Sequence, residues 1–330
     1  MKNDIEFNGR RTFCWALFVR QDIYPQRFLK GTDGGKVEYN WRHRLRGETM
    51  ERIAWVTDST GTLDEELSLN EHVYVVPMIV IIDGKEYEDG VDLSPEELYR
   101  RMSEEKKNAT TSQPSVGRFQ ELYKELEKRY DRIIAVHLSS ELSGTVSASR
   151  QAAQMVTIPV DIFDTLLISF PMLLIMKRLM HYIDNGHSIN EAFVKTRIYA
   201  DNHETYVLIG SLDQLHRSGR LTNAQYILGS LLSFKPIISI ENGLLHTKSK
   251  PRNLNKAEKQ IFTDFRRSVE AGKVKECTIL YGAVSEQAQR WKKMISAEFP
   301  HVLTHVSPLG SAIGVHTGEQ TIGLSWFNED

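Results

Sequence analysis

Two hydroxyl-rich stretches decide the fold of this sequence: Thr110-Thr111-Ser112-Gln113-Pro114-Ser115 and Ser139-Ser140-Glu141-Leu142-Ser143-Gly144-Thr145. Each ends where an amphipathic helix is predicted, because apolar residues follow at helical spacing from Phe119 and from Val146. We expect a sharp turn at the first stretch, since Ser115 is a good N-cap and the proline before it disfavours helical geometry in the preceding residue.

Two such helix starts can receive an anionic oxygen group. Free backbone N–H groups and the positive end of the helix dipole point outward there, and Ser and Thr side chains add hydroxyl donors. Helix capping alone explains the hydroxyls of a single stretch. Two stretches of nearly the same build favour a binding site.

Strands and helices alternate from residue 50 to about residue 204. The apolar runs 53–58, 133–138 and 159–164 predict strands, and Ser94-Pro95-Glu96-Glu97 predicts a helix start. A further apolar run, 73–82, is expected to form one strand closed by an Asp-Gly hairpin turn. The alternation predicts a mostly parallel sheet with helices on its faces, in which ligands bind beyond the carboxyl ends of the strands. Both hydroxyl-rich stretches are expected to be loops at these ends.

A second, smaller α/β domain of mixed strands is predicted from about residue 205. Its expected strands are 206–209, 236–240, 244–247, 277–281, 302–306 and 321–326. A helical stretch is expected after the segment 212–220, up to about Leu232, and further helices over 255–271 and 286–299. An Asn-Gly pair at 242–243 predicts a hairpin turn. We therefore divide this part of the chain into an N-terminal α/β domain, 50–204, which holds both hydroxyl-rich stretches, and a C-terminal α/β domain, 205–330.

The composition is that of an ordinary globular protein. Of 330 residues, 41% are apolar and 25% charged, enough for two domains with real cores. A net charge of −2 gives no electrostatic footprint for nucleic acid. Only Cys14 and Cys277 occur, which excludes a disulfide framework and fits a reducing cytosol. The scattered histidines show no metal-ligand spacing.

Residues 1–49 differ from the rest of the chain. Their net charge is +4 against −6 for 50–330, and they show no helical or alternating period. The apolar cluster Phe13–Val19 does not fit a signal peptide, because it is at the lower limit of the usual length, Arg20 closes it, and no small-residue cleavage site follows. We interpret 1–49 as a disordered extension or as translated sequence upstream of the true start at Met50.

The run 166–180 is the most apolar of the chain. A membrane span is disfavoured, because the uninterrupted part is short and Lys177-Arg178 interrupt it. A helix buried between layers is the expected outcome, and such a helix could also line an acyl pocket.

The two hydroxyl-rich stretches resemble the Thr-Ser-Gln-Pro-Ser and Leu-Ser-Ser-Glu-Leu-Ser-Gly-Thr motifs of the DegV family of bacterial fatty-acid-binding proteins. Three further segments are similar to that family and run in its order: the opening strand and Asp-Ser turn at 53–60, the Leu-x-x-Leu-x-x-x-Gly-Arg segment at 212–220, and the His-Thr-Gly at 316–318. Together they cover about residues 52 to 325, and five motifs in order are specific.

The resemblance implies a two-domain DegV-like (EDD) fold and a lipid-binding site. It implies that the hydroxyls of Thr111 and Ser143 hold the carboxylate of a long-chain fatty acid, with the backbone N–H of Gly144 beside them. It also implies that His316 lies beside the head group and Arg220 near the mouth of an apolar tunnel between the domains. Without the resemblance, His316 is only a histidine between two glycines, as compatible with a turn as with a site.

The resemblance further implies a carrier rather than an enzyme. Such proteins present the fatty acid to a separate fatty acid kinase, which phosphorylates the carboxylate for phospholipid synthesis. The sequence itself has no nucleotide-binding loop, so no cofactor is expected. The implied location is the cytoplasm, and the implied role allows transient contact with the membrane.

Two alternatives from other classes stay open at this point. One is a hydrolase with Ser143 or Ser140 as nucleophile and His316 as base, although no Gly-x-Ser-x-Gly elbow occurs. The other is a phosphate or sugar-phosphate binder that uses the same helix starts. His137 lies on a predicted buried strand, and we expect it to be a hydrogen-bonded core histidine.

Overall fold

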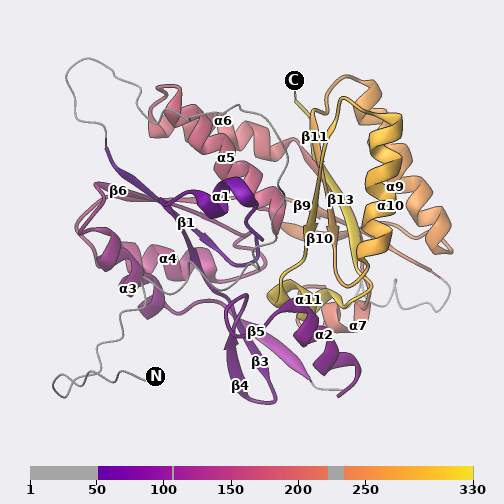
Figure 1. Cartoon of the computed structure of the whole chain (residues 1–330), viewed down its shortest axis with the longest axis horizontal. Coiled ribbons are helices and arrows are strands. Elements are labelled where there is room, and N and C mark those ends of the chain that lie inside the picture. The colour runs from indigo at the N-terminus through magenta and orange to yellow at the C-terminus, as the bar shows by residue number, and fades with distance from the viewer. Residues whose placement is uncertain (1–50, 106–107, 222–233, 330) are drawn as a thin grey trace, which may run out of the picture. The chain divides into compact units, whose positions relative to one another are not determined.

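The computed structural model describes residues 51–105, 108–221 and 234–329 (Figure 1). The extension predicted for 1–49 and the helix predicted towards Leu232 lie outside the described residues. Within them, strands and helices form an α/β fold with three sheets, which confirms the predicted fold class. None of the described helices is both long enough and apolar enough to cross a membrane.

The first sheet is parallel and has four strands. In spatial order they are β2 (Val73–Val76), β1 (Ile53–Asp58), β6 (Arg132–His137) and β7 (Val160–Asp164). The strands are apolar on both sides, because alternate residues enter two different cores. Ala54 and Ile133 pack under α3 and α4, whereas Trp55 and Ile134 face α5.

Four helices cover this sheet (Figure 1). They are α3 (Val116–Leu126) and α4 (Thr145–Ala153) on one face, and α5 (Phe170–Asp184) and α6 (Ile189–Asp201) on the other. Ser115 and Ser188 cap α3 and α6 with their side chains. The short α1 (Glu65–Leu69) is capped by Asp64 in the same way.

Helix α5 is the buried helix predicted from the apolar run 166–180. Nine of its fifteen residues, all in its first three turns, are buried between the layers. Its polar end carries Lys177, whose ammonium group pairs with Asp64 and Glu66 at the helix flank. Gly186 follows with a φ of 85°, a conformation that glycine adopts without strain and that helps to end the helix.

A second sheet, antiparallel, corrects one prediction. Its strands, in spatial order, are β4 (Lys85–Glu88), β3 (Ile79–Ile82) and β5 (Ala109–Ser112). The run 73–82 was expected to be one strand, but it forms β2 in the parallel sheet and β3 here. The break falls at Pro77, which has no N–H to donate to a sheet ladder.

The same sheet corrects the prediction of a loop at the first hydroxyl-rich stretch. Thr110, Thr111 and Ser112 belong to β5, where Thr111 pairs with Val80 of β3. Only Gln113 to Ser115 form the turn into α3. Thr111 therefore projects from the edge strand of an antiparallel sheet, and not from the carboxyl end of a parallel strand.

The third sheet has six strands, of which only β11 and β12 pair in parallel. In spatial order they are β10 (Leu244–Ser249), β9 (Ile237–Glu241), β8 (His203–Leu208), β13 (Ile322–Phe327), β11 (Glu276–Tyr281) and β12 (Leu303–Pro308). Asn242 and Gly243 have φ values of 50° and 80°, so the predicted Asn-Gly hairpin turn is present. The strands up to β7 belong to the first two sheets, and the strands from β8 onward belong to the third. The domain limits, 50–204 and 205–330, stay a prediction.

Helices α9 (Leu254–Glu270) and α10 (Ser285–Glu298) cover one face of the six-stranded sheet (Figure 1). Phe265 and Trp291 are fully buried there against Trp326 of β13. The opposite face turns towards α5, where Tyr199 of α6 stacks on Phe327 with ring centroids 4.4 Å apart. This second face contributes to the cavity described below.

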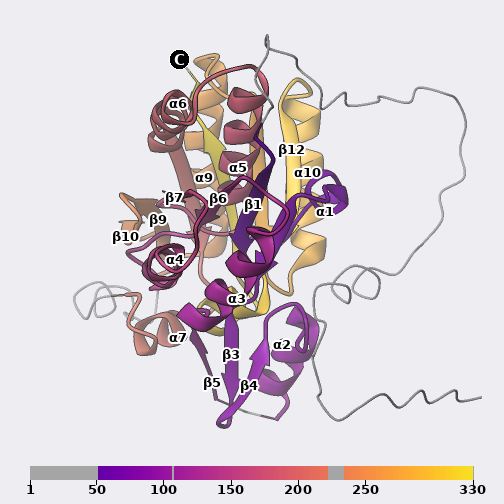
Figure 2. The same ribbon diagram turned by 90° about the vertical axis from the view of Figure 1, so that its left-hand side faces the viewer.

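Three short helices complete the fold. They are α2 (Pro95–Ser103), α7 (Leu212–Arg217) and α11 (Ser311–Thr317). Although α11 comes from the last twenty residues of the chain, it contacts α2, α7, β3 and β5. Figure 2 shows α2 beside the three-stranded sheet at the lower end of the described structure, with α7 near it.

Close packing of α2 on α11 depends on a glycine. A Cβ added to Gly314 would lie 2.6 Å from Oη and 3.0 Å from Cε1 of Tyr99, whose ring is buried. Real Cβ atoms essentially never lie as close as 2.6 Å to a neighbouring atom. The two helices can therefore approach this closely only because residue 314 lacks a side chain.

We expect Gly314→Ala to lower the free energy of unfolding by about 1–3 kcal/mol, because the added methyl group must displace Tyr99 or α11. Urea denaturation followed by circular dichroism measures the change. Gly117→Ala is the matched control, since the nearest atom to its Cβ would be 3.7 Å away and the position is helical. That control should be neutral or stabilising by up to about 1 kcal/mol. Equal destabilisation by both substitutions would contradict the packing argument.

Candidate functional site

The candidate site is an apolar cavity lined by the six-stranded sheet, by Thr111 of the three-stranded sheet, by helices α7 and α11, and by loops that follow strands of the parallel sheet. The empty space between its walls is ≈ 910 Å³, including the part open to solvent. Val207 of β8, Ile238 of β9 and Leu280 of β11 line it from the six-stranded sheet. Leu138 and Ile168 line it from the loops that follow β6 and β7.

The cavity wall follows from the alternation of side chains along β8. Thr205 and Val207 point into the cavity, whereas Tyr206 and Leu208 pack under α9 and α10. One face of the sheet thus builds the core of the C-terminal part and the other face lines the cavity. Both faces are apolar, and the sequence pattern alone does not distinguish them.

Four of the five predicted site residues line this one cavity. They are Thr111 of β5, Ser143 before α4, Arg220 after α7 and His316 of α11. The hydroxyl of Thr111 and Nε2 of His316 are 2.7 Å apart, although 205 positions separate the two residues. His316 thus lies on a helix, and not in the turn that its flanking glycines allow.

Ser143 and Gly144 form the start of α4. The Ser143 and Thr145 hydroxyl oxygens are 2.9 Å apart, and Gly144 is the N-cap residue without a side-chain cap. Gly144 itself is not among the cavity-lining residues, but a Cβ there would lie 2.9 Å from Nε2 of Gln113. The second hydroxyl-rich stretch therefore packs directly against the first.

Arg220 brings a positive charge to the cavity wall. Its Nε donates a hydrogen bond to the carbonyl of Leu142 at 3.3 Å, and its Nη1 donates to the carbonyl of Ser218. Both acceptors are neutral. Burial lowers the pKa of the guanidinium from its ordinary value, which leaves it charged at neutral pH.

His316 is uncharged at neutral pH. Burial, and secondly the charge of Arg220, lower its pKa to about 4. A neutral imidazole carries a proton on one nitrogen only. Within the described part of the chain, Nδ1 is buried and has no hydrogen-bond partner, whereas Nε2 meets Thr111.

A buried carboxyl group holds the start of the helix that carries His316. The backbone of Ser311 and Ala312, at the start of α11, hydrogen-bonds to Asp89, and Ser59 Oγ donates to Oδ2 of Asp89 at 2.9 Å. Burial raises the pKa of Asp89 to about 6. Sequence reasoning missed Asp89, because its only local signal is an Asp-Gly pair that also fits an ordinary turn.

The geometry does not support the hydrolase alternative. The hydroxyl bonded to His316 is that of Thr111, and the partner of Ser143 is Thr145. His137, the other histidine considered, is fully buried and has partners at both ring nitrogens. Nδ1 lies 3.3 Å from Asp58 Oδ2, and Nε2 lies 3.0 Å from Ser149 Oγ, as predicted for a core histidine.

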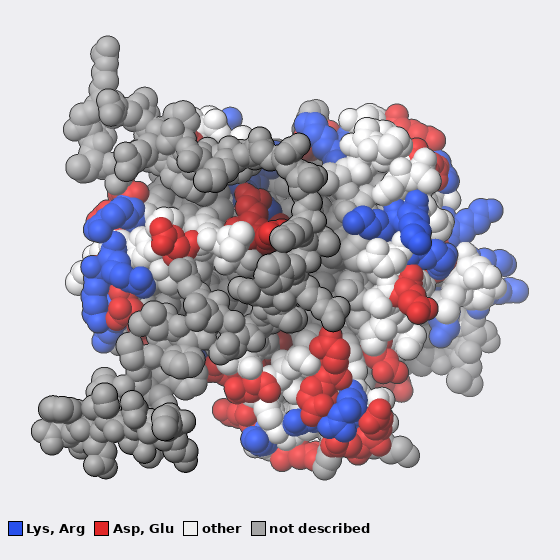
Figure 3. All heavy atoms as spheres, viewed as in Figure 1, with Lys and Arg blue, Asp and Glu red and all other residues white. Residues whose placement is uncertain are grey.

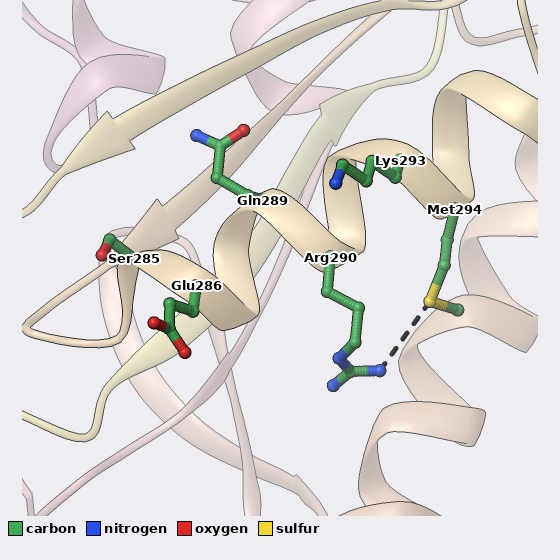
Figure 4. Close-up of a pocket in the computed structure, with 6 residues that line it drawn as sticks. All are labelled: Ser285, Glu286, Gln289, Arg290, Lys293 and Met294. Atoms are coloured by element: carbon green, nitrogen blue, oxygen red, sulfur yellow. Dashed lines mark hydrogen bonds between the residues drawn. The ribbon is translucent and has the colours of Figure 1, made fainter.

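A second hollow lies on the outer side of α10 (Figure 4). All its lining residues come from that one helix, and their side chains project in different directions. Arg290 is bound to Glu258 at 2.7 Å and approaches the sulfur of Met294 at 3.8 Å. A hollow built from one exposed helix face has no converging groups, so we do not regard it as a site.

The visible surface carries both signs of charge. In the view of Figure 3, acidic side chains gather over α2 and β4, and basic side chains gather over α10. The acidic side chains of α2 are partly neutralised, since Glu97 pairs with Arg100 and Arg101. No single-signed surface that would attract nucleic acid covers the described residues on this face.

Comparison with known proteins identifies the family. The chain matches the family model described as "Uncharacterised protein, DegV family" over residues 52–329. The chain belongs to the DegV family. Protein DegV of Bacillus subtilis (strain 168) is 32% identical over 276 residues, which cover 83% of this chain and 98% of that protein. A DegV domain-containing protein of Listeria monocytogenes is 32% identical over 278 residues, covering 84% and 98% of the two chains.

Solved DegV structures share the fold. The crystal structure of DegV from Bacillus subtilis, described as a fatty acid binding protein, aligns with a TM-score of 0.78 at 30% identity. The alignment covers 85% of this chain and 100% of the Bacillus subtilis chain. A DegV family protein from Thermus thermophilus, whose structure is described as showing fatty acid binding, aligns with a TM-score of 0.77 at 30% identity, covering 84% and 99%.

The pKa of His316 predicts how the stability of this DegV protein depends on pH. In the unfolded chain the histidine titrates near 6.5, and in the fold near 4, so unfolding takes up a proton between these values. The His316 contribution to stability is therefore present above pH 6.5. It is lost as the pH falls towards 4, by at most about 3 kcal/mol.

The measurement is the difference in unfolding free energy between wild type and His316→Gln from pH 4 to pH 7. The difference isolates His316 from Asp89, whose raised pKa acts in the opposite direction within an overlapping range. We expect the wild type to lose stability relative to the variant on acidification. A difference independent of pH would show that His316 is not buried in its neutral form.

Proposed function

We propose that this protein binds a long-chain fatty acid, with its carboxylate at Thr111, Ser143, Gly144 and His316 and its hydrocarbon tail in the cavity. The observation that carries the proposal is the grouping of hydroxyl and imidazole side chains at one part of an otherwise apolar cavity. The DegV relatives at 30% identity whose structures are described as fatty-acid-binding support it.

The apolar walls supply the affinity. Removing a CH₂ group from water contributes roughly 0.8 kcal/mol, so a tail of about ten buried CH₂ groups contributes on the order of 8 kcal/mol. Val207, Ile238 and Leu280 offer such surface on the sheet side, and Leu142 and Ile313 offer it on the opposite side. A phosphate or sugar-phosphate would leave this surface without a partner, which disfavours that alternative.

The tautomer of His316 decides whether the Thr111 hydroxyl can donate a hydrogen bond to the carboxylate. If His316 carries its proton on Nε2, it donates to the hydroxyl oxygen of Thr111, and the Thr111 proton is then free for the ligand. The unpartnered Nδ1 is the unprotonated nitrogen in this tautomer. Ser143 and the N–H of Gly144 add donors at the start of α4, whose dipole favours negative charge.

We expect Thr111→Val and Ser143→Ala each to weaken binding of octadecanoic acid about tenfold, because each removes one hydroxyl donor to a buried carboxylate. Competition against a fluorescent fatty acid measures the dissociation constants. Thr263→Val is the matched control, since Thr263 is exposed on α9 and its hydroxyl bonds its own helix. Unchanged affinity in both site variants would refute the head-group assignment.

The finer part of the proposal concerns a partner. The protein presents the head group to a cytoplasmic fatty acid kinase, and the charge of Arg220 stabilises the acyl-phosphate that forms there. In support, Arg220 is half-buried at the cavity, and its hydrogen-bond acceptors among the described residues are two neutral carbonyl groups. A positive charge so placed stabilises developing phosphate charge more than a carboxylate that hydroxyls already bind.

Arg220→Ala should therefore bind octadecanoic acid within about threefold of wild type and lower acyl-phosphate formation on the order of a hundredfold. The assay combines the variant with a fatty acid kinase and ATP and follows the acyl-phosphate. Arg267→Ala, which removes an exposed arginine of α9, is the control for lost charge. Normal transfer by Arg220→Ala would remove Arg220 from this role.

A further inference from the structure

One hydroxyl group in the cavity wall has no partner. Ser169, the residue before α5, is fully buried and lines the cavity. Its Oγ makes no hydrogen bond to any other described residue. A buried hydroxyl without a partner loses its bonds to water and gains none, so each such group in a folded protein needs an explanation.

The other hydroxyls on the same walls are already bonded. Thr205 Oγ1 lies 2.7 Å from Ser325 Oγ, and Thr321 donates to the carbonyl of Thr317 at 2.8 Å. Thr317 in turn donates to the carbonyl of Ile313 at 3.2 Å. These groups present mainly their methyl carbons to a ligand, whereas Ser169 presents a free donor and acceptor.

The backbone at Ser169 is strained. Its φ of 65° and ψ of −153° lie in a region that is essentially confined to glycine. Helix capping does not explain the serine, because its side chain accepts no bond from the first turn of α5. Ser169 thus adopts a conformation that glycine prefers, and its hydroxyl group is unbonded. Both features indicate that the hydroxyl group has a functional role.

Ser169 lies on the tail side of the cavity. The helix it precedes packs against α6, β6 and β11, whereas α11, which carries His316, packs against α2, α7, β3 and β5. Phe170, next to Ser169, joins Leu280 and Leu309 in one apolar cluster, and the two leucines also line the cavity. The free hydroxyl therefore faces the part of the cavity proposed for the hydrocarbon chain.

We propose that the cavity accepts a hydroxylated acyl chain, in which a hydroxyl group along the chain hydrogen-bonds Ser169 Oγ. This inference rests on the proposed function and names the substrate class of the same cavity. A plain hydrocarbon tail leaves Ser169 unbonded. A chain hydroxyl at the matching carbon makes one hydrogen bond with Ser169 Oγ, as donor or as acceptor, and so recovers part of what it loses on leaving water.

The test measures the affinity of the full chain for octadecanoic acid and for its monohydroxylated analogues, with the hydroxyl moved carbon by carbon. We expect one position, or two adjacent ones, to bind about tenfold tighter than the other hydroxylated positions. In Ser169→Ala that preference should disappear, while plain octadecanoic acid still binds.

Two further variants keep the test clear of folding effects. Ser169→Gly suits the strained backbone, so we expect it to raise the melting temperature and still to abolish the preference. Thr196→Val is the matched control, because Thr196 is also fully buried with an unpartnered hydroxyl but does not line the cavity. The control should keep the positional preference.

The outcomes separate this inference from the proposed function. If octadecanoic acid binds but affinity does not depend on the hydroxyl position, or if the dependence survives in Ser169→Ala and Ser169→Gly, the inference is overturned and the fatty acid site stands. If a trapped water molecule, and not the hydroxyl group of the ligand, bonds to Ser169 Oγ, the inference is likewise overturned and the fatty acid site stands. If no fatty acid binds at all, the proposed function fails and the inference fails with it.

Discussion

The position of α11 is the constraint on which the rest of the site depends. This helix is short, yet it is held at three points: at its start by the buried Asp89, along its side by Tyr99 packed on Gly314, and near its end by the bond between His316 and Thr111. Each contact joins the end of the chain to a segment from its first half. Loosening any of them shifts the imidazole relative to the hydroxyl of Thr111.

The cavity exists because α9 and α10 cover only one face of the six-stranded sheet, and part of the other face lines an unfilled space. The parallel sheet is covered on both sides, with α5 between it and the six-stranded sheet. Beyond α5, the face of the six-stranded sheet opposite α9 and α10 supplies cavity residues such as Val207 and Ile238. Near the start of α5 this face borders the cavity, where Leu280 and Ser169 line it.

The polar groups of the cavity divide into those that the protein satisfies and those that it leaves open. Thr205 and Thr321 are bonded within the protein and serve packing. His316 Nδ1 and Ser169 Oγ are buried without a partner among the described residues, and Ser169 is also strained. Strain and unsatisfied atoms lower stability, so their coincidence at Ser169, in the cavity wall, is itself a functional signal.

The sequence by itself determined the local structure and the family. Periodicity found most of the strands and helices, although not β5, α1 or α11. The Asn-Gly pair predicted its hairpin, and the run 166–180 was correctly interpreted as a buried helix. The motifs were enough to identify the DegV family, because they depend on residue type and order. Tertiary structure alone decided that Pro77 divides one apolar run between two sheets, that Thr111 lies on a strand, and that Asp89 holds α11. It also decided that Thr111 and His316 meet across 205 positions and that Ser169 faces the cavity unbonded. The physical reason is range: helix and strand periods arise from neighbouring residues, whereas these contacts arise from packing between segments that the sequence does not place together.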